Sequence, residues 1–162
     1  MTTYEHSTAV PIETLLPDIE ELLGRIVKEY HADLGLVSSS DITNTNILIG
    51  SDITPELPTR SLPHHGNMSF CMMTIHRPIP VIIKSLNKNR FFFDHPLTKM
   101  YNFVTYVGLP IIYIDNVQED HYIGSMCLFF RDEVSNDIRA YDKILREIEV
   151  LMEKKFKDKN VV

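Results

Sequence analysis

The sequence contains only two cysteines among its 162 residues. Neither Cys71 nor Cys127 stands in a Cys-x-x-Cys pair or at the Cys/His spacing of zinc ligands. This scarcity excludes a disulfide framework and argues against a structural zinc site, and free thiols of this kind suit a reducing cytosol.

A long apolar run is also missing. The longest nearly apolar stretch, Val107–Ile114, is far shorter than the roughly 20 residues that a helix needs to cross a bilayer. The first residues, Met-Thr-Thr-Tyr-Glu-His, offer neither the basic nor the apolar region of a signal peptide. We therefore expect a cytoplasmic protein with no membrane partner.

Positive charge is scarce, since 16 Lys and Arg stand against 22 Asp and Glu and give a formal net charge of -6. The field of such a protein repels polyphosphate and anionic lipid, which argues against nucleic acid as a partner of the bulk surface. Lys84, Lys88 and Arg90 form a local basic cluster. This cluster is either a solvated face or a surface that steers an anionic ligand or a partner protein.

Catalytic motifs are absent as well. We find no Ser/His/Asp triad spacing, no glycine-rich phosphate loop and no paired carboxylates placed to cooperate. His64 and His65 lie a few residues before Cys71, but such a pair in a loop is more commonly polar surface than a metal site. The sequence therefore predicts no catalytic residues, no metal and no cofactor, and favours a protein that is not an enzyme.

What the sequence does contain is enough apolar material for one core. A chain of 162 residues with 44% hydrophobic content buries one sizeable core, whereas two domains would each be small. We expect a flexible N-terminus over residues 1–10, a single domain over residues 11–157 and a C-terminal tail over residues 158–162.

Two amphipathic helices are predicted near the ends of the chain. Apolar residues recur at spacings of three and four over Leu15–Tyr30, and Pro17 fits the first turn because its missing N–H has no intrahelical partner there. The same spacing covers Ile138–Met152, with Ser135 as a candidate N-cap.

Between these helices, strand-like runs alternate with turn-forming residues. The predicted strands cover residues 34–38, 45–51, 81–83, 103–114 with a break at Gly108 and Pro110, and 122–131 with a bulge at Gly124. Helical turns are predicted at 69–75 and 96–100, and a long loop at 52–67. This order predicts an α+β fold in which a central antiparallel sheet of about six strands carries the terminal helices on one face.

Five motifs, in order over residues 68–132, resemble those of a GAF domain. They are Ser69-Phe70-Cys71, Ile79-Pro80-Val81-Ile82, Asn89-Arg90-Phe91-Phe92-Phe93-Asp94-His95-Pro96-Leu97, Val104-Thr105-Tyr106-Val107-Gly108-Leu109-Pro110-Ile111 and Gly124-Ser125-Met126-Cys127-Leu128. Each motif alone is weak, but five in this order make the resemblance specific.

The resemblance implies a fold similar to that of PAS domains, with a small ligand bound between the sheet and the loops that cross it. By position in the motifs, it implies that the ligand contacts Phe70, Cys71, Phe92, Phe93, Asp94, Pro96, Leu97, Phe103 and Tyr106. A mostly apolar pocket with a few polar groups is the usual form of such a site. The residues Phe91, Phe92 and Phe93 cannot all face one side of an extended segment, so a phenylalanine either closes the pocket or fills it.

The sequence departs from the specialised members of this family. Phe130-Arg131-Asp132-Glu133 stands where cyclic-nucleotide-binding relatives carry a different signature, and Met72 follows Cys71 where chromophore-bearing relatives have a histidine. Free methionine sulfoxide reductases of this fold use several cysteines, whereas only Cys71 and Cys127 are present. Cyclic nucleotides and a covalent bilin are therefore disfavoured, and reductase chemistry lacks its usual resolving pair.

The leading hypothesis is a small-molecule-binding regulatory sensor that acts in signal transduction through a separate effector protein. Its ligand would be an unidentified small molecule or small anion, and its terminal helices would pair two copies as a homodimer. One alternative is an enzyme similar to the free methionine-(R)-sulfoxide reductases, which would depend on Cys71. The other is a ligandless GAF module for interaction or dimerisation, with its pocket filled by its own side chains.

Overall fold

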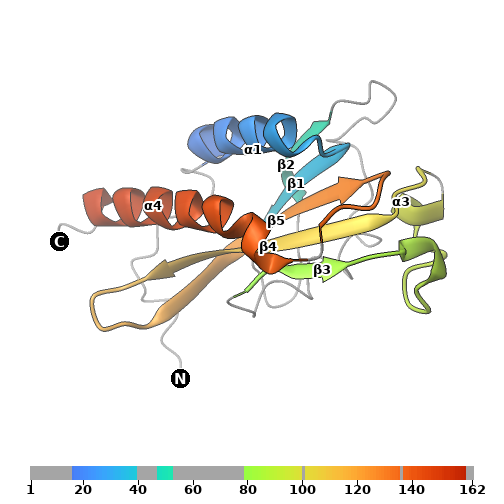
Figure 1. The fold of residues 1–162 in the computed structure, drawn as a ribbon. Helices are drawn as coiled ribbons and strands as arrows, with labels where there is room; N and C mark the ends of the chain where they lie inside the picture. Colours follow the sequence, from blue (N-terminus) through green and yellow to red (C-terminus); the bar gives the residue numbers. More distant parts are fainter. Residues whose placement is uncertain (1–15, 40–46, 53–78, 100, 136, 160–162) are drawn as a thin grey trace.

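The computed structural model describes residues 16–39, 47–52, 79–99, 101–135 and 137–159, and every structural statement below refers to these ranges (Figure 1). The predicted flexible N-terminus, the helical turns at 69–75 and all but the first residue of the predicted long loop lie outside them.

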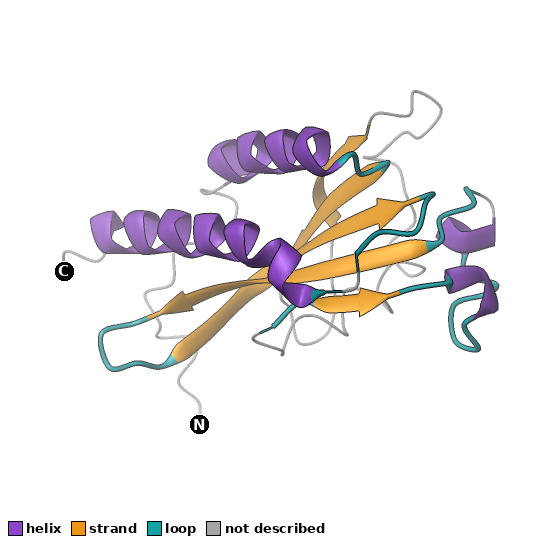
Figure 2. Ribbon diagram, in the orientation of Figure 1, coloured by secondary structure: helices purple, strands orange, loops and turns teal. Residues whose placement is uncertain are grey.

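The described residues form one antiparallel sheet with two long helices on one side (Figures 1 and 2). In chain order, the elements are α1 (Leu16–Tyr30), β1 (Leu34–Ser39), β2 (Ile47–Asp52), β3 (Val81–Ile83), the 3-10 helix η4 (Leu86–Lys88), α3 (Pro96–Lys99), β4 (Thr105–Ile114), β5 (Asp120–Phe130), the 3-10 helix η5 (Ile138–Tyr141) and α4 (Asp142–Lys159). The five strands lie in the order β2-β1-β5-β4-β3. The α+β class is confirmed, and five of the roughly six expected strands fall within the described ranges.

Helix α1 begins and ends close to its predicted bounds. Its apolar spacing places one buried stripe on the sheet, and Pro17 lies in the first turn, where no N–H is needed. His31 adopts a left-handed conformation with φ of 57°, and the Ala32 N–H donates to the Val27 carbonyl at 3.0 Å, which closes the helix end. In the described part of the chain, no helix is long and apolar enough to cross a membrane.

Strands β4 and β5 form the long central hairpin of the sheet. β4 is one long strand, as predicted, but it runs through Gly108 and Pro110 without the predicted break. β3 pairs with β4 only as far as Gly108, so among the described strands Pro110 faces none on that side, and its missing N–H costs no ladder bond. The bulge lies in β5 at Ile123, one residue from the predicted Gly124, because Ile111 pairs with Gly124 and Ile112 with Tyr122.

The C-terminal helical segment is capped by Asp137, so the prediction of Ser135 as N-cap is wrong. The Asp137 carboxylate accepts from the Arg139 N–H at 3.0 Å at the start of η5. The Ser135 hydroxyl instead accepts from the Asp137 N–H at 3.1 Å and orders the approach to the helix.

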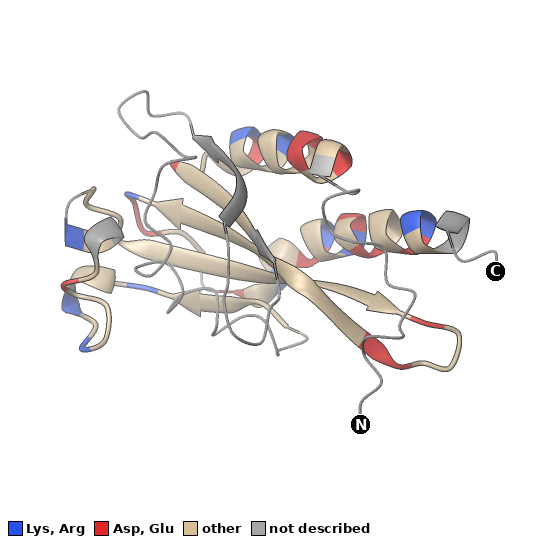
Figure 3. Cartoon of the chain, turned by 180° about the vertical axis from the view of Figure 1, so that it is seen from behind, with Lys and Arg blue, Asp and Glu red and all other residues tan. Residues whose placement is uncertain are grey.

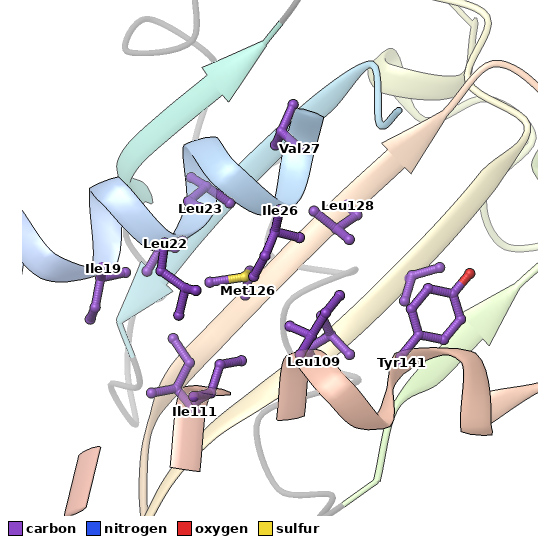
Figure 4. Close-up of a cluster of buried hydrophobic side chains, with 14 of the residues drawn as sticks. Ile19, Leu22, Leu23, Ile26, Val27, Leu109, Ile111, Met126, Leu128 and Tyr141 are labelled. Carbon is purple, nitrogen blue, oxygen red and sulfur yellow. The ribbon is translucent and has the colours of Figure 1, made fainter. Parts of the chain in front are cut away.

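The larger core lies between the two long helices and one face of the sheet (Figure 4). Alternate residues of the central strands point into it, because side chains of a strand face opposite sides in turn. Labelled members of this cluster are Ile19, Leu22, Leu23, Ile26 and Val27 of α1, Leu109 and Ile111 of β4, Met126 and Leu128 of β5, and Tyr141 of η5.

The close packing of α1 on the sheet depends on Gly35 of β1. A Cβ atom at Gly35 would lie 2.6 Å from Val27 Cγ2 and 2.9 Å from Leu23 Cδ1, which is closer than packed atoms approach. Gly24, on α1 itself, has nothing within 4 Å of such an atom.

We expect Gly35→Ala to lower the free energy of unfolding by about 1–3 kcal/mol, because the added methyl group pushes α1 off the sheet. Gly24→Ala is the control, and we expect it to raise that free energy by up to about 1 kcal/mol through helix propensity. Urea denaturation of both variants measures the two effects. A Gly35→Ala variant as stable as the parent protein would contradict this packing.

Candidate ligand-binding site

A second apolar cluster lies on the sheet face that points away from α1 and α4. The central strands supply it with the residues that alternate with those of the larger core. Its buried members are Leu34 and Leu36 of β1, Tyr106 of β4, Cys127 and Phe129 of β5, and Leu86, Phe92 and Phe103 from the connection between β3 and β4. We call this cluster the site cluster.

Residues 84–99, here called the lid segment, lie at the end of the sheet beyond β3 and contribute Leu86 and Phe92 to the site cluster (Figure 1). The Leu86 N–H donates to the Val104 carbonyl at 2.9 Å, which fixes the segment to the start of β4. The Asn89 side-chain oxygen then accepts from the Phe91 N–H at 2.8 Å and the Phe92 N–H at 3.2 Å. This turn directs Phe92 inward, where it is 5% exposed, and leaves its two phenylalanine neighbours outside.

Three polar groups lie on this otherwise apolar face. The Tyr106 hydroxyl and the Cys127 Sγ atom are 3.3 Å apart, and the Ser125 hydroxyl lies 3.6 Å from the same sulfur. All three side chains are fully buried. Hydroxyl and thiol groups can donate or accept, so this row of atoms can adapt to a polar group of a ligand.

His95 and Thr98 are the buried polar residues of the lid segment. The His95 ring lies 6.4 Å, centroid to centroid, from the Phe92 ring. Burial lowers the pKa of His95 from 6.5 to about 4, and the Asp94 carboxylate offsets part of this shift. The imidazole is therefore neutral at pH 7 and offers one donor and one acceptor.

The structure places the predicted site residues in three groups. Phe92, Phe103 and Tyr106 come together in the site cluster. Phe93 and Asp94 are exposed and lie outside it, because the turn at Asn89 directs them to solvent. Pro96 and Leu97 form the first turn of α3, while Phe70 and Cys71 lie outside the described residues. That any of these residues binds a ligand stays a prediction.

Sequence reasoning missed several members of the site cluster. Cys127 and Phe129 alternate with Met126 and Leu128 along β5. A continuous apolar run of this kind indicates a strand that is buried on both faces, so both residues could have been predicted to lie in the site cluster. Leu86 could not have been predicted in this way. A single leucine after a three-residue strand belongs to no repeating pattern that would show which way its side chain points.

A separate group of possible metal ligands lies on the turn between β4 and β5. One ligand atom each of Asp115, Glu119 and His121 lies within 4.8 Å of the others. Asp115 is already engaged, because its Oδ2 atom lies 2.8 Å from His121 Nε2 and its Oδ1 atom accepts from the Val117 and Glu119 N–H groups. These contacts lower the pKa of Asp115, first through His121. The group is remote from the site cluster.

Two surface grooves of the described part run along α4, on the helical side of the sheet. One, of about 330 Å³, lies between α1 and α4 and is floored by Leu22 and Leu151. The other, of about 400 Å³, lies between α4 and the outer part of β4. Neither groove is lined by a residue of the site cluster.

No family model matches the sequence, and no curated protein sequence matches it significantly. Solved structures do match it. The GAF3 domain of a Synechocystis protein, in its photoproduct state, superposes with a TM-score of 0.63 over 91% of this chain and 99% of its own, at 10% identity. The chain has a GAF fold.

Two further solved structures superpose on the chain with similar scores. A domain of a two-component sensor histidine kinase from Sinorhizobium meliloti superposes with a TM-score of 0.60 at 13% identity, over 91% of this chain and 92% of its own. The NreA protein of Staphylococcus aureus, mutated in its nitrate binding site, superposes with a TM-score of 0.55 at 13% identity. The match covers 76% of this chain and 92% of the NreA chain. At such low identity, these likenesses establish the GAF fold that the sequence motifs predicted, and the fold alone.

The neutral His95 of this GAF fold makes a prediction about pH. Below pH 6.5 the unfolded chain gains a proton at His95 that the folded chain does not take up until about pH 4. We expect stability to fall with decreasing pH in this window, by about 2 kcal/mol between neutral pH and pH 5. Urea denaturation over this pH range measures the loss of stability. His95→Gln is the control, because glutamine cannot take up a proton and the variant should lack this part of the pH dependence. Equal losses in the parent and the variant would contradict the neutral imidazole.

Proposed function

We propose that the protein is a regulatory sensor that binds a small molecule and acts in signal transduction through a separate effector protein. The observation that carries this proposal is the site cluster, which is apolar except for a row of buried polar atoms and to which the lid segment adds Leu86 and Phe92. A mostly apolar site with a few converging polar groups is the usual form of a small-molecule site.

The chemistry of the site cluster limits the ligand that it would take. The row formed by Ser125, Cys127 and the Tyr106 hydroxyl offers hydrogen bonds without a fixed charge. A small neutral molecule or a small anion fits such a surface better than a cation, because no carboxylate belongs to the cluster. The nitrate binding site named for the NreA protein supports the inclusion of small anions.

The lid segment offers a route by which binding would become a signal. The Phe92 ring packs in the site cluster, while the backbone around it is a series of turns with bonds such as His95 N–H to Phe92 carbonyl at 3.1 Å. A ligand beneath Phe92 would displace the ring, and the turn would move with it. A ligand that favours one of two lid positions shifts the population between them.

We further propose that α1 and α4 pair two copies of the chain. The two helices lie side by side and are tied by the ion pairs Arg25–Glu147, Lys143–Glu29 and Lys155–Asp18, which place them antiparallel. The groove between them has an apolar floor, and Val150 on its wall is 55% exposed. A second helix pair would cover this surface and complete a helical bundle.

One observation also favours a ligandless module. Phe92 occupies the site cluster so closely that it is nearly fully buried. In that case the phenylalanine is a permanent part of the core, and the protein would act through its surfaces alone.

A ligand screen tests the sensor proposal. We expect thermal-shift and native mass spectrometry screens over metabolites and small anions, nitrate included, to find a binder that raises Tm. Tyr106→Phe should weaken that binder by about 2- to 10-fold, because one hydrogen bond is lost. Tyr113→Phe is the control, since Tyr113 packs against Phe156 and lies outside the site cluster. If the screens find no binder, the ligandless module is favoured. A binder that Tyr106→Phe binds as tightly as the parent does would contradict the site cluster as its binding site.

Light scattering and analytical ultracentrifugation test the dimer. We expect a dimer whose Kd rises at least about tenfold on Val150→Glu, because a charge would be buried between the helix pairs. Val117→Glu is the matched control, since Val117 is exposed on the turn between β4 and β5, away from the helices. A protein that stays monomeric at high concentration would contradict the pairing.

A further inference from the structure

The lid segment exposes two phenylalanines to solvent, one on each side of the buried Phe92 in the sequence. Phe91 is 75% exposed and Phe93 is 54% exposed. Single exposed apolar side chains are common on protein surfaces, but two large aromatic rings exposed within three residues of one turn are a feature that marks interaction sites.

The exposure of these rings is built into the turn. The Asn89 side chain and carbonyl together hold the N–H groups of the residues that follow, including the Phe93 N–H at 2.9 Å. Burial of Phe92 anchors the centre of the turn to the sheet. With the inner ring buried, its two neighbours point outward, and their exposure does not come from a frayed chain end.

Cationic residues flank the exposed rings in the sequence, and one of them contacts a ring. The Arg90 guanidinium lies 5.6 Å from the centroid of the Phe91 ring, within the range of a cation–π contact. Arg90, Lys88 and Lys99 form no ion pair within the described part of the chain. Lys84, at the base of the lid segment, lies 3.9 Å from Glu133.

This local charge opposes that of the whole molecule. The lid segment carries four Lys and Arg and a single acidic residue, Asp94, whereas the chain as a whole has a net charge of -6. Figure 3 shows several Lys and Arg positions on the loops at this end of the sheet, together with a few acidic ones. A partner approaching this end therefore meets a positive field and two apolar rings.

We propose that Phe91, Phe93, Lys88 and Arg90, here called the aromatic-basic tip, dock an acidic segment of a partner protein that also carries aromatic side chains. Aromatic residues and arginine are the types enriched at the energetic centres of protein interfaces. The cations would pair with carboxylates and the rings would stack on the aromatic residues of the segment. This inference goes beyond the sensor proposal and does not need a bound small molecule.

An anionic membrane is the less favoured occupant. The net charge of -6 repels such a surface, and stable membrane attachment needs a longer polybasic patch or a second anchor. A protein segment can be small enough to meet the positive tip without approaching the acidic remainder of the molecule.

Fluorescence anisotropy with a labelled random copolymer of glutamate and tyrosine tests the proposal on the full chain without added ligand. We expect binding that weakens between about 50 and about 300 mM salt. The double variant Phe91→Ser/Phe93→Ser and the variant Arg90→Glu should each raise the Kd about tenfold or more. Circular dichroism and urea denaturation confirm that each variant is folded.

Matched controls separate the tip from general surface effects. Val117→Ser removes an apolar side chain that is 77% exposed at the β4–β5 turn, and Lys28→Glu reverses an exposed charge on α1. Both should bind the copolymer as the parent does. No binding by the parent, or equal losses in the controls, would overturn the proposal. Binding to phosphatidylserine vesicles in preference to the copolymer would overturn it in favour of a membrane.

Discussion

Strand β5 is buried on both of its faces, and the two functional halves of the molecule depend on this constraint. Met126 and Leu128 face α1 and α4, whereas Cys127 and Phe129 face the site cluster. A strand of this kind allows no slip in register, because a shift by one residue would exchange the two faces. The backbone of β5 therefore positions both the residues that pack against the helices and the residues that belong to the site cluster.

The lid segment shows how one buried ring organises two surfaces. Phe92 packs on the floor that β5 and Tyr106 provide, and the turn at Asn89 makes its neighbours point to solvent. Any ligand that displaces Phe92 would also reorient Phe91 and Phe93. The proposed small-molecule site and the aromatic-basic tip are thus two sides of one turn, so occupation of the first can alter what the second presents to a partner.

Much of this fold could be predicted from the sequence because its patterns are local. The spacing of apolar residues located α1, and five motifs in order identified the GAF fold. The predicted break at Pro110 was wrong because the length of β3, a non-local feature, decides whether the missing N–H matters. Ser135 was mistaken for the N-cap because Asp137, two residues later, competes for the same role.

The candidate site was predictable only in part, for a related reason. Phe92, Phe103 and Tyr106, three of the predicted site residues, lie in one buried cluster, and their binding of a ligand stays a prediction. The direction of Phe93 and Asp94, however, depends on hydrogen bonds to Asn89 that no period in the sequence reveals. His95 was missed because its neutrality arises from burial in the folded chain.

A crystal structure of the purified protein, grown with the best binder from the ligand screens, tests the central claim most directly. We predict electron density for a bound molecule beneath the lid segment, within hydrogen-bond distance of the Tyr106 hydroxyl, and a displaced Phe92 ring. A Phe92 ring still buried in the site cluster, with the binder elsewhere on the surface, would contradict the account.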